Sequence, residues 1–320
     1  MKVSEDVFKS SIQAYLSNLI DYAGLFPPAQ LPLEPAIQNY AAYKSYKDSW
    51  MLGRFIIPAT RLGELDPYVP LFSEEKRLDI SAIGGRSKGV EDCLNVLGAD
   101  LKKQANFCMR HEGIVAINMF EMPLPPIVPN QRLLERIATE TAEYNMQTFC
   151  EVTMSLDEEW EMNMLKTLDE IAQYNLKSGH SLGVKLRTGG VTANAFPTPE
   201  QVATVLVGCS ERNIPQKFTA GLHHPIRMYR EEVNTSMHGF LNVFTAGMLA
   251  RTHKLDRATI AKILADQESS NFTFTNRGIT WKDLEVEASD IEQLRQNALC
   301  SYGSCSFCEP REDLRTLQLI

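Results

Sequence analysis

The chain has 320 residues and a formal net charge of −8, with 44% hydrophobic and 22% charged residues. This composition excludes a largely disordered chain, and the acidic balance argues against nonspecific attraction to nucleic acid or anionic lipid. No apolar run approaches the roughly 18 residues of a membrane span, and the acidic residues within 1–6 do not fit a secretion signal. Seven cysteines in such a chain favour reduced thiols, so we expect a cytoplasmic protein that binds neither nucleic acid nor membranes.

Short apolar runs alternate along the chain with longer segments of helical periodicity. The expected strands are residues 19–26, 52–58, 78–84, 114–122, 148–154, 182–188, 217–222 and 241–245. The expected helices are residues 33–46, 90–108, 130–144, 158–174 and 198–212, the last with a capping box at Thr198. Eight strand–helix units predict an α/β fold, a (β/α)8 TIM barrel. An open doubly wound sheet is the alternative, but no G-x-G-x-x-G motif follows the first strand.

The chain is expected to form a single domain, with the barrel at about residues 15–266. Residues 267–320 are interpreted as a C-terminal extension packed on it, which either caps the barrel or builds a homo-oligomer interface. This segment contains Cys300, Cys305 and Cys308. A C-x-x-C pair with no fourth ligand nearby is a weak metal signal, and incidental thiols are the favoured interpretation.

The sixth and seventh predicted strands each place a lysine on the face expected to point into the barrel. Lys185 and Arg187 alternate with apolar residues on one strand, and Lys217 and Thr219 do so on the next. Two ammonium groups at the same height would disfavour each other's ionisation, and a neutral amine is the nucleophile that forms an imine with a carbonyl. The alternatives are a stabilising network with carboxylates, or a solvated Lys217 at the lower rim.

These two strands resemble those of deoxyribose-phosphate aldolases. Val184-Lys185-x-x-Thr188-Gly189 is similar to that family's Schiff-base strand, and Lys217-x-Thr219-x-Gly221 is similar to its second-lysine strand. The resemblance implies that Lys185 forms the imine and that Lys217 lowers its pKa. Two departures stand out: Arg187 replaces a small hydroxyl residue, and residues 114–118 lack the acid that the family uses for proton transfer.

The whole chain is also similar to a bacterial (β/α)8-barrel family. The motifs that carry this likeness are D-Y-A-G-L-F-P-P-A, K-L-R-T-G-G, T-A-G-L-H-H-P and G-S-C-S-F. That resemblance implies a barrel and no particular activity.

Further polar residues are expected at the carboxyl ends of the strands, where barrel enzymes bind substrates. Glu151 is interpreted as a general acid/base or the partner of Lys185, with an ion pair to Arg187 as the alternative. Backbone N–H groups at the glycine-rich turns, and at a helix start near Gly247, could hold a phosphate or carboxylate, although such glycines are often only steric. The residues expected to bind substrate are Asp21, Arg187, Thr188, Gly189, Gly190, Thr219, Gly221, His223 and Asn242.

A metal site is the alternative use of the same rim. Glu121, Glu151, His223 and His224 offer carboxylate and imidazole ligands suited to a divalent metal. Adjacent histidines usually point apart, so only one of the two would ligate.

The leading hypothesis is a class I, Schiff-base-forming, aldolase-like lyase that acts on a small anionic carbonyl compound without a cofactor, with Lys185, Lys217 and Glu151 as its catalytic residues. One alternative is a metal-dependent isomerase, lyase or hydrolase that uses the ligand set above. Another is a non-catalytic barrel that binds a small ligand.

Overall fold

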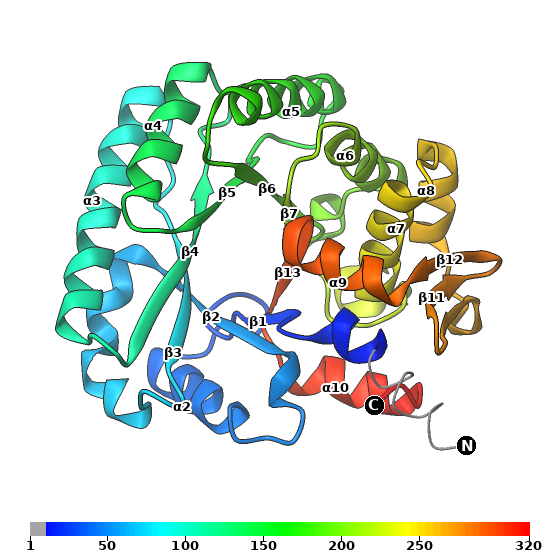
Figure 1. The fold of residues 1–320 in the computed structure, drawn as a ribbon, viewed down its shortest axis with the longest axis horizontal. Coiled ribbons are helices and arrows are strands. Elements are labelled where there is room, and N and C mark those ends of the chain that lie inside the picture. Colours follow the sequence, from blue (N-terminus) through cyan, green and yellow to red (C-terminus); the bar gives the residue numbers. More distant parts are fainter. Residues whose placement is uncertain (1–10) are drawn as a thin grey trace.

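The computed structural model describes residues 11–320, and Figure 1 shows a ring of helices around a set of inner strands. The expectation that residues 1–6 do not form a secretion signal concerns residues outside the described part of the chain. Eight parallel strands close into a barrel in the order β1-β13-β7-β6-β5-β4-β3-β2. Their bounds are β1 Ile20–Tyr22, β2 Leu52–Pro58, β3 Leu78–Ile83, β4 Val115–Pro123, β5 Gln147–Glu151, β6 Leu182–Arg187, β7 Gln216–Thr219 and β13 Leu299–Ser304. The predicted (β/α)8 TIM barrel is therefore confirmed.

Five outer helices lie where the apolar periodicity predicts them. They are α2 Leu33–Tyr43, α3 Val90–Arg110, α4 Gln131–Ala142, α5 Trp160–Lys177 and α6 Pro199–Glu211. The capping box at Thr198 is present, with the side chain of Gln201 as its second member. The connection from β2 to β3 is instead a 3₁₀ segment, Ala59–Leu71, which contains Pro67 and Pro70. Proline inside an α-helix removes a backbone hydrogen bond, and the segment therefore does not form a regular helix.

The eighth strand was predicted in the wrong place. Residues 241–245 belong to helix α7, Phe240–Thr252, in which every residue from Phe240 to Ala250 is buried. A helix that is apolar all round has no polar stripe, so a short piece of it cannot be distinguished from a buried strand. The eighth strand is β13, which pairs in parallel with β7 and β1. Residues 267–320 thus contain the strand that closes the barrel and are not an extension packed on a barrel that is already closed. The predicted barrel end at residue 266 is wrong.

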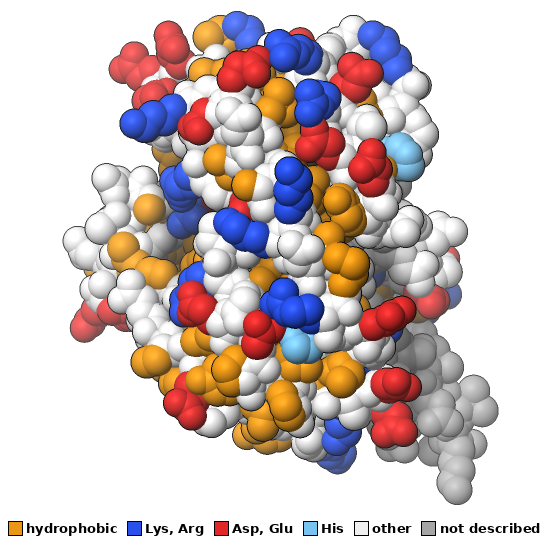
Figure 2. All heavy atoms as spheres, turned by 90° about the vertical axis from the view of Figure 1, so that its left-hand side faces the viewer, with side chains coloured by type: hydrophobic (Ala, Val, Ile, Leu, Met, Phe, Trp, Pro, Cys, Tyr) orange, Lys and Arg blue, Asp and Glu red, His pale blue; other side chains and the backbone are white. Residues whose placement is uncertain are grey.

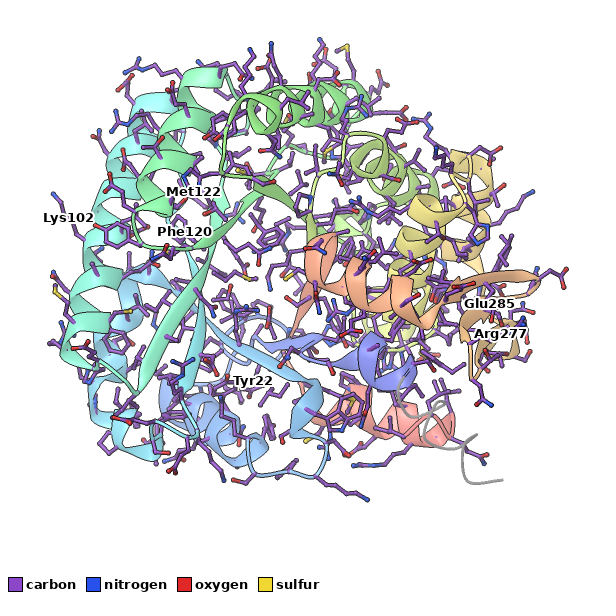
Figure 3. All side chains as sticks on the ribbon, viewed as in Figure 1. Tyr22, Lys102, Phe120, Met122, Arg277 and Glu285 are labelled. Carbon is purple, nitrogen blue, oxygen red and sulfur yellow. The ribbon has the colours of Figure 1, made fainter. Side chains whose placement is uncertain are left out.

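A long excursion separates β7 from β13. In chain order it contains the hairpin β8 Met228–Arg230 and β9 Thr235–Met237, helices α7 and α8 Arg257–Ala265, the sheet β10 Phe272–Phe274, β11 Gly278–Trp281 and β12 Leu284–Glu287, and helix α9 Ala288–Asn297. Figure 3 labels Arg277 and Glu285 at the small sheet, where their charged groups lie 4.0 Å apart. Helix α10, Cys308–Thr316, follows β13.

The strands present apolar side chains outward and polar ones inward. Phe120 and Met122 lie between β4 and the helices α3 and α4 (Figure 3). Phe218 of β7 packs edge-on against Phe244 of α7, with ring centroids 5.2 Å apart. Each such buried side chain stabilises the fold by about 1.5–3 kcal/mol. Because side chains alternate along a strand, Glu121 between Phe120 and Met122 must point into the barrel.

The outer surface carries charges of both signs. Figure 2 shows the face at the left of Figure 1, where Lys and Arg side chains are interspersed with Asp and Glu among apolar groups. Within residues 11–320, no helix combines the length and apolarity needed to cross a membrane.

Candidate functional site

A cavity of about 330 Å³ lies at the carboxyl ends of the barrel strands. Every strand contributes to its lining, through a residue at its end or just after it. These residues are Ala23, Pro58, Gly84, Pro123, Glu151, Arg187, Thr219 and Gly303. The Pro27-Pro28 turn after β1 also lines the cavity, at the pocket edge where the sequence predicts it. The volume suits a small molecule.

Lys185 lies in the floor of this cavity. Its neighbours on β6 pack outward, and its own side chain points inward and is 2% exposed. The Nζ atom is 2.5 Å from Oε2 of Glu121 and 2.6 Å from Oε2 of Glu151. Burial alone lowers the pKa of Lys185, but the two carboxylates more than offset it, so the pKa is raised above its usual value. Lys185 is therefore an ammonium ion in the resting protein.

Lys217 is at the same height on the barrel, because β6 and β7 pair Lys185 with Lys217 in register. The expected inward orientation and matching height are confirmed. The ammonium of Lys217 forms a very short ion pair with Asp21, lies 2.8 Å from Oγ of Ser301, and lies 3.5 Å from Oε1 of Glu121. Its side chain is completely buried beneath the cavity, so a solvated position at the lower rim is excluded.

Glu121 separates the two lysines. It contacts both ammonium groups and accepts a hydrogen bond from the Ser81 hydroxyl at 2.6 Å. Burial raises the pKa of Glu121, but the attraction of Lys185 and Lys217 prevails and lowers it to about 2. The expected lowering of the pKa of Lys185 is wrong, because Glu121 and Glu151 raise it. The sequence predicts Glu121 only as an alternative metal ligand.

Glu151 contacts both of the cationic partners considered for it, Lys185 and Arg187. Its Oε2 contacts Lys185, and its Oε1 lies 3.6 Å from a guanidinium nitrogen of Arg187. Burial raises its pKa, but Lys185 and then Arg187 lower it, with a net lowering. Unlike Glu121, it lines the cavity. Glu151 is therefore the carboxylate that a bound molecule can reach.

The rim of the cavity is cationic. Arg187 has a side chain 44% exposed and lines the cavity together with Arg86. A second hollow of about 520 Å³ shares both arginines and Glu151, and extends over residues 152–157. A small anion in either hollow would meet two guanidinium groups that can bind a carboxylate or phosphate in bidentate fashion.

The turns after β6 and β7 are held together by Thr188 and two glycines. The Thr188 hydroxyl donates to the carbonyl oxygen of Ala220 at 2.6 Å, and the side chain is fully buried. Gly221 has φ of 75°, and a Cβ there would approach Cα of Gly189 to 2.9 Å. Thr188 and Gly189 therefore support the wall from behind, whereas Gly190, Thr219 and Gly221 line the cavity.

Two of the predicted binding residues lie elsewhere. Asn242 is on α7, where its amide accepts from the backbone N–H of Arg227 and donates to the carbonyl oxygens of Ile263 and Asp266. It fastens this helix in place and does not line the cavity. Asp21 is sealed beneath the floor with Lys217. Gly247 lies inside α7, so no helix begins there to bind an anion.

The two adjacent histidines line different hollows, although both rings approach Glu309, His223 at 3.5 Å and His224 at 4.0 Å. His223 lines the cavity of Lys185, whereas Nδ1 of His224 lies 2.6 Å from Asp313 of α10. Glu121 and Glu151 are both paired with Lys185. Among residues 11–320, no three His, Cys, Asp or Glu side chains are grouped as metal ligands. The ligand set considered for a metal is therefore not brought together.

Three residues of β13 and the turn after it are missing from the predicted site. Ser301 and Gly303 belong to β13, which was assigned to an extension, and Cys305 was considered incidental. All three follow from placing the eighth strand at residues 299–304, where Ser301 and Gly303 point inward and Cys305 follows the strand end. The G-S-C-S-F motif was the available signal.

Comparison with known proteins adds little beyond the fold. No protein-family model and no curated protein matches the chain. Solved structures that resemble it include a xylose isomerase domain protein from Alicyclobacillus acidocaldarius, 10% identical with a TM-score of 0.39 over 78% of this chain and 98% of that one. The carboxyl transferase domain of Rhizobium etli pyruvate carboxylase is 14% identical with a TM-score of 0.43, over 99% of this chain and 56% of that one. A beta-glucosidase is 12% identical with a TM-score of 0.21, over 67% of each chain. Likenesses this remote carry no argument about activity.

Proposed function

We propose that the chain is an enzyme that acts on a small anionic carbonyl compound through an imine at Lys185, as a class I lyase. The observation that carries the proposal is the position of the Lys185 amine, in the floor of a small cavity between two carboxylates and below a cationic rim. The likeness of the β6 and β7 motifs to deoxyribose-phosphate aldolases supports the same chemistry.

Arg187 and Arg86 would bind the anionic group of the substrate. An anion at Arg187 competes with Glu151, which lies 3.6 Å from the same guanidinium group. Substrate binding therefore weakens the contact between Arg187 and Glu151, so that Glu151 can accept a proton from Lys185. With its negative charge held at the rim, the substrate has its carbonyl carbon above the amine.

Glu151 would carry the protons. Proton transfer from the Lys185 ammonium to Glu151 leaves a neutral amine, whose nitrogen attacks the carbonyl carbon while the oxygen takes a proton back. Loss of water then gives an iminium ion, so that the ammonium and the carbonyl compound yield one iminium and one water. The iminium nitrogen accepts the electron pair of the C–C bond that a lyase breaks.

Glu121 and Lys217 would act from beneath as positioning residues. Glu121 is held by Lys185, Lys217 and Ser81 and does not line the cavity, so it remains a fixed counterion. It keeps positive charge at Lys185 favourable, which also stabilises the iminium ion once formed.

Borohydride trapping tests the proposal directly. We expect reduction with sodium borohydride in the presence of small carbonyl compounds (pyruvate, glyoxylate, glyceraldehyde 3-phosphate, acetaldehyde) to leave an adduct at Lys185, located by peptide mass spectrometry. Because the neutral amine reacts and the pKa of Lys185 is raised, the trapping rate should increase from about pH 6 to about pH 9. Lys185→Arg is the matched control, since arginine keeps a cation between the acids and forms no imine. No adduct at Lys185 with any of these compounds would count against the imine.

A second candidate is favoured by the raised pKa of Lys185. In it Lys185 stays an ammonium ion and stabilises an enolate while Glu151 removes a proton next to the carbonyl. That enzyme would exchange the α-hydrogen of an anionic carbonyl compound with D2O, observed by NMR, without any trapped adduct. Part of this exchange should survive in Lys185→Arg, whereas imine chemistry should not.

A further inference from the structure

The cavity has a second nucleophile on the wall formed by the ends of β7 and β13. His223 and Cys305 both line it, together with Lys185. The Cys305 Sγ lies 3.7 Å from Nδ1 of His223, within hydrogen-bonding distance for sulfur. An imidazolium next to a thiol favours the thiolate, which is the reactive form.

Glu309 supports a charged imidazole in this position. Its Oε2 lies 3.5 Å from the same Nδ1 atom of His223. Burial lowers the pKa of His223, but hydrogen bonds to Cys305 and Glu309 reverse this and raise it to about 9. The ring therefore carries a positive charge at neutral pH, and a cationic imidazole beside sulfur favours the reactive thiolate.

The other half-buried cysteines of this part of the chain, Cys300 and Cys308, differ in two respects, and the first is that within residues 11–320 neither has an imidazole as its hydrogen-bonding partner. Cys308 lies 4.0 Å from a guanidinium nitrogen of Arg311, which cannot accept a proton, and Cys300 has the Gln147 amide oxygen at 3.9 Å. Neither lines the cavity of Lys185. They serve as internal standards for thiol reactivity within the same protein.

We propose that Cys305 and His223 form a second covalent site of the cavity, which adds to soft carbon electrophiles of the α,β-unsaturated carbonyl class that carry a negative charge. The sulfur attacks the β-carbon, a C–S bond forms, and the π electrons of the C=C bond move to the α-carbon. That carbon takes a proton from the imidazolium of His223, and the proton that sulfur loses restores the ring, so S–H is added across the double bond and no oxidant or reductant is required. Arg187 and Arg86 at the rim supply the preference for an anion. The proposal goes beyond the imine chemistry and does not require it.

Labelling with two matched maleimides tests this site. Brief treatment with N-ethylmaleimide near pH 6.5, followed by peptide mass spectrometry, should label Cys305 about tenfold faster than Cys300 or Cys308. His223→Gln should reduce the rate at Cys305 to that of the other two. Glu309 is 41% exposed, so Glu309→Gln should leave folding intact, and it should also lower the labelling rate of Cys305. Equal rates at the three cysteines, or an unchanged rate in both variants, would overturn the proposal.

The charged probe tests the class of electrophile. At low salt, 3-maleimidopropionate should react faster than N-ethylmaleimide at Cys305 but not at Cys300, and Arg187→Ala should abolish this advantage. No preference for the anionic maleimide would overturn the assignment of an anionic electrophile. Labelling of Cys305 should persist in Lys185→Arg, so failure of imine trapping and failure at Cys305 are separate results.

Discussion

Lys185 and Lys217 are neighbours in register, yet their surroundings differ in one decisive way. Both are buried and both touch Glu121. Lys185 has its second carboxylate, Glu151, in the wall of the cavity, whereas Lys217 has its own, Asp21, sealed below the floor. A bound molecule can therefore reach the carboxylate paired with Lys185 but not the one paired with Lys217. Access to the partner acid, rather than the position of the lysine, decides which amine can lose its ion pair when a ligand binds.

Removal of the sealed lysine should have the largest effect. Lys217→Met leaves Asp21 buried without a cation, so we expect the free energy of unfolding to fall by about 3–5 kcal/mol, measured by urea denaturation. The double variant Asp21→Asn, Lys217→Met removes both charges and should recover part of the loss. A loss below about 1 kcal/mol, typical of a solvent-exposed ion pair, would show that water reaches the Asp21–Lys217 pair.

Acid should break the network through Glu121. Its pKa of about 2 lies below the ordinary value of 4.5, so its contribution of about 3 kcal/mol is present above pH 4.5 and is lost as the pH falls toward 2. Urea unfolding at a series of pH values should show this decline, and Glu121→Gln should flatten it. An identical slope in both proteins would refute the role of Glu121 as the counterion of the two lysines.

Substitution of Arg187, at the exposed rim of the cavity, should have the smallest effect on the free energy of unfolding. Arg187 is half-exposed and 3.6 Å from Glu151, so Arg187→Ala should change the free energy of unfolding by at most about 1 kcal/mol. The same variant should weaken binding of an anionic carbonyl compound about tenfold while leaving a neutral analogue unaffected, as measured by calorimetry. Equal weakening of both ligands would contradict an anion site at the rim.

Seven of the eight strands could be predicted because their outward residues are apolar and their ends are marked. The eighth could not, for a physical reason. β13 carries Ser301 and Gly303 on its inner face, where a hydroxyl is needed for Lys217 and empty space for the cavity. Its other positions do not compensate, since Leu299 and Tyr302 are the only large hydrophobic residues among the six, and the fully buried helix α7 has a stronger apolar pattern.

The sequence predicts several of the residues at the site but not which of them form ion pairs with each other. Strand alternation placed Lys185, Arg187, Glu151 and His223 at one mouth, because each strand end is defined by its own sequence. The pairing of Glu121 with both lysines depends on the shape of the closed barrel, and Asp21 meets Ser301 across 280 residues of sequence. No local pattern contains that information, and the pKa of Lys185 therefore has the opposite direction from the one expected.

The late position of β13 has a consequence for synthesis on the ribosome. Until residues 299–304 have emerged, β1 and β7 are both free edges with unpaired backbone groups, and a polar interior is open to water. A nascent chain that already holds seven strands is thus exposed to wrong edge pairing while residues 220–298 are made. Completion of the barrel and burial of the Asp21–Lys217 pair occur together, at the last strand to be made.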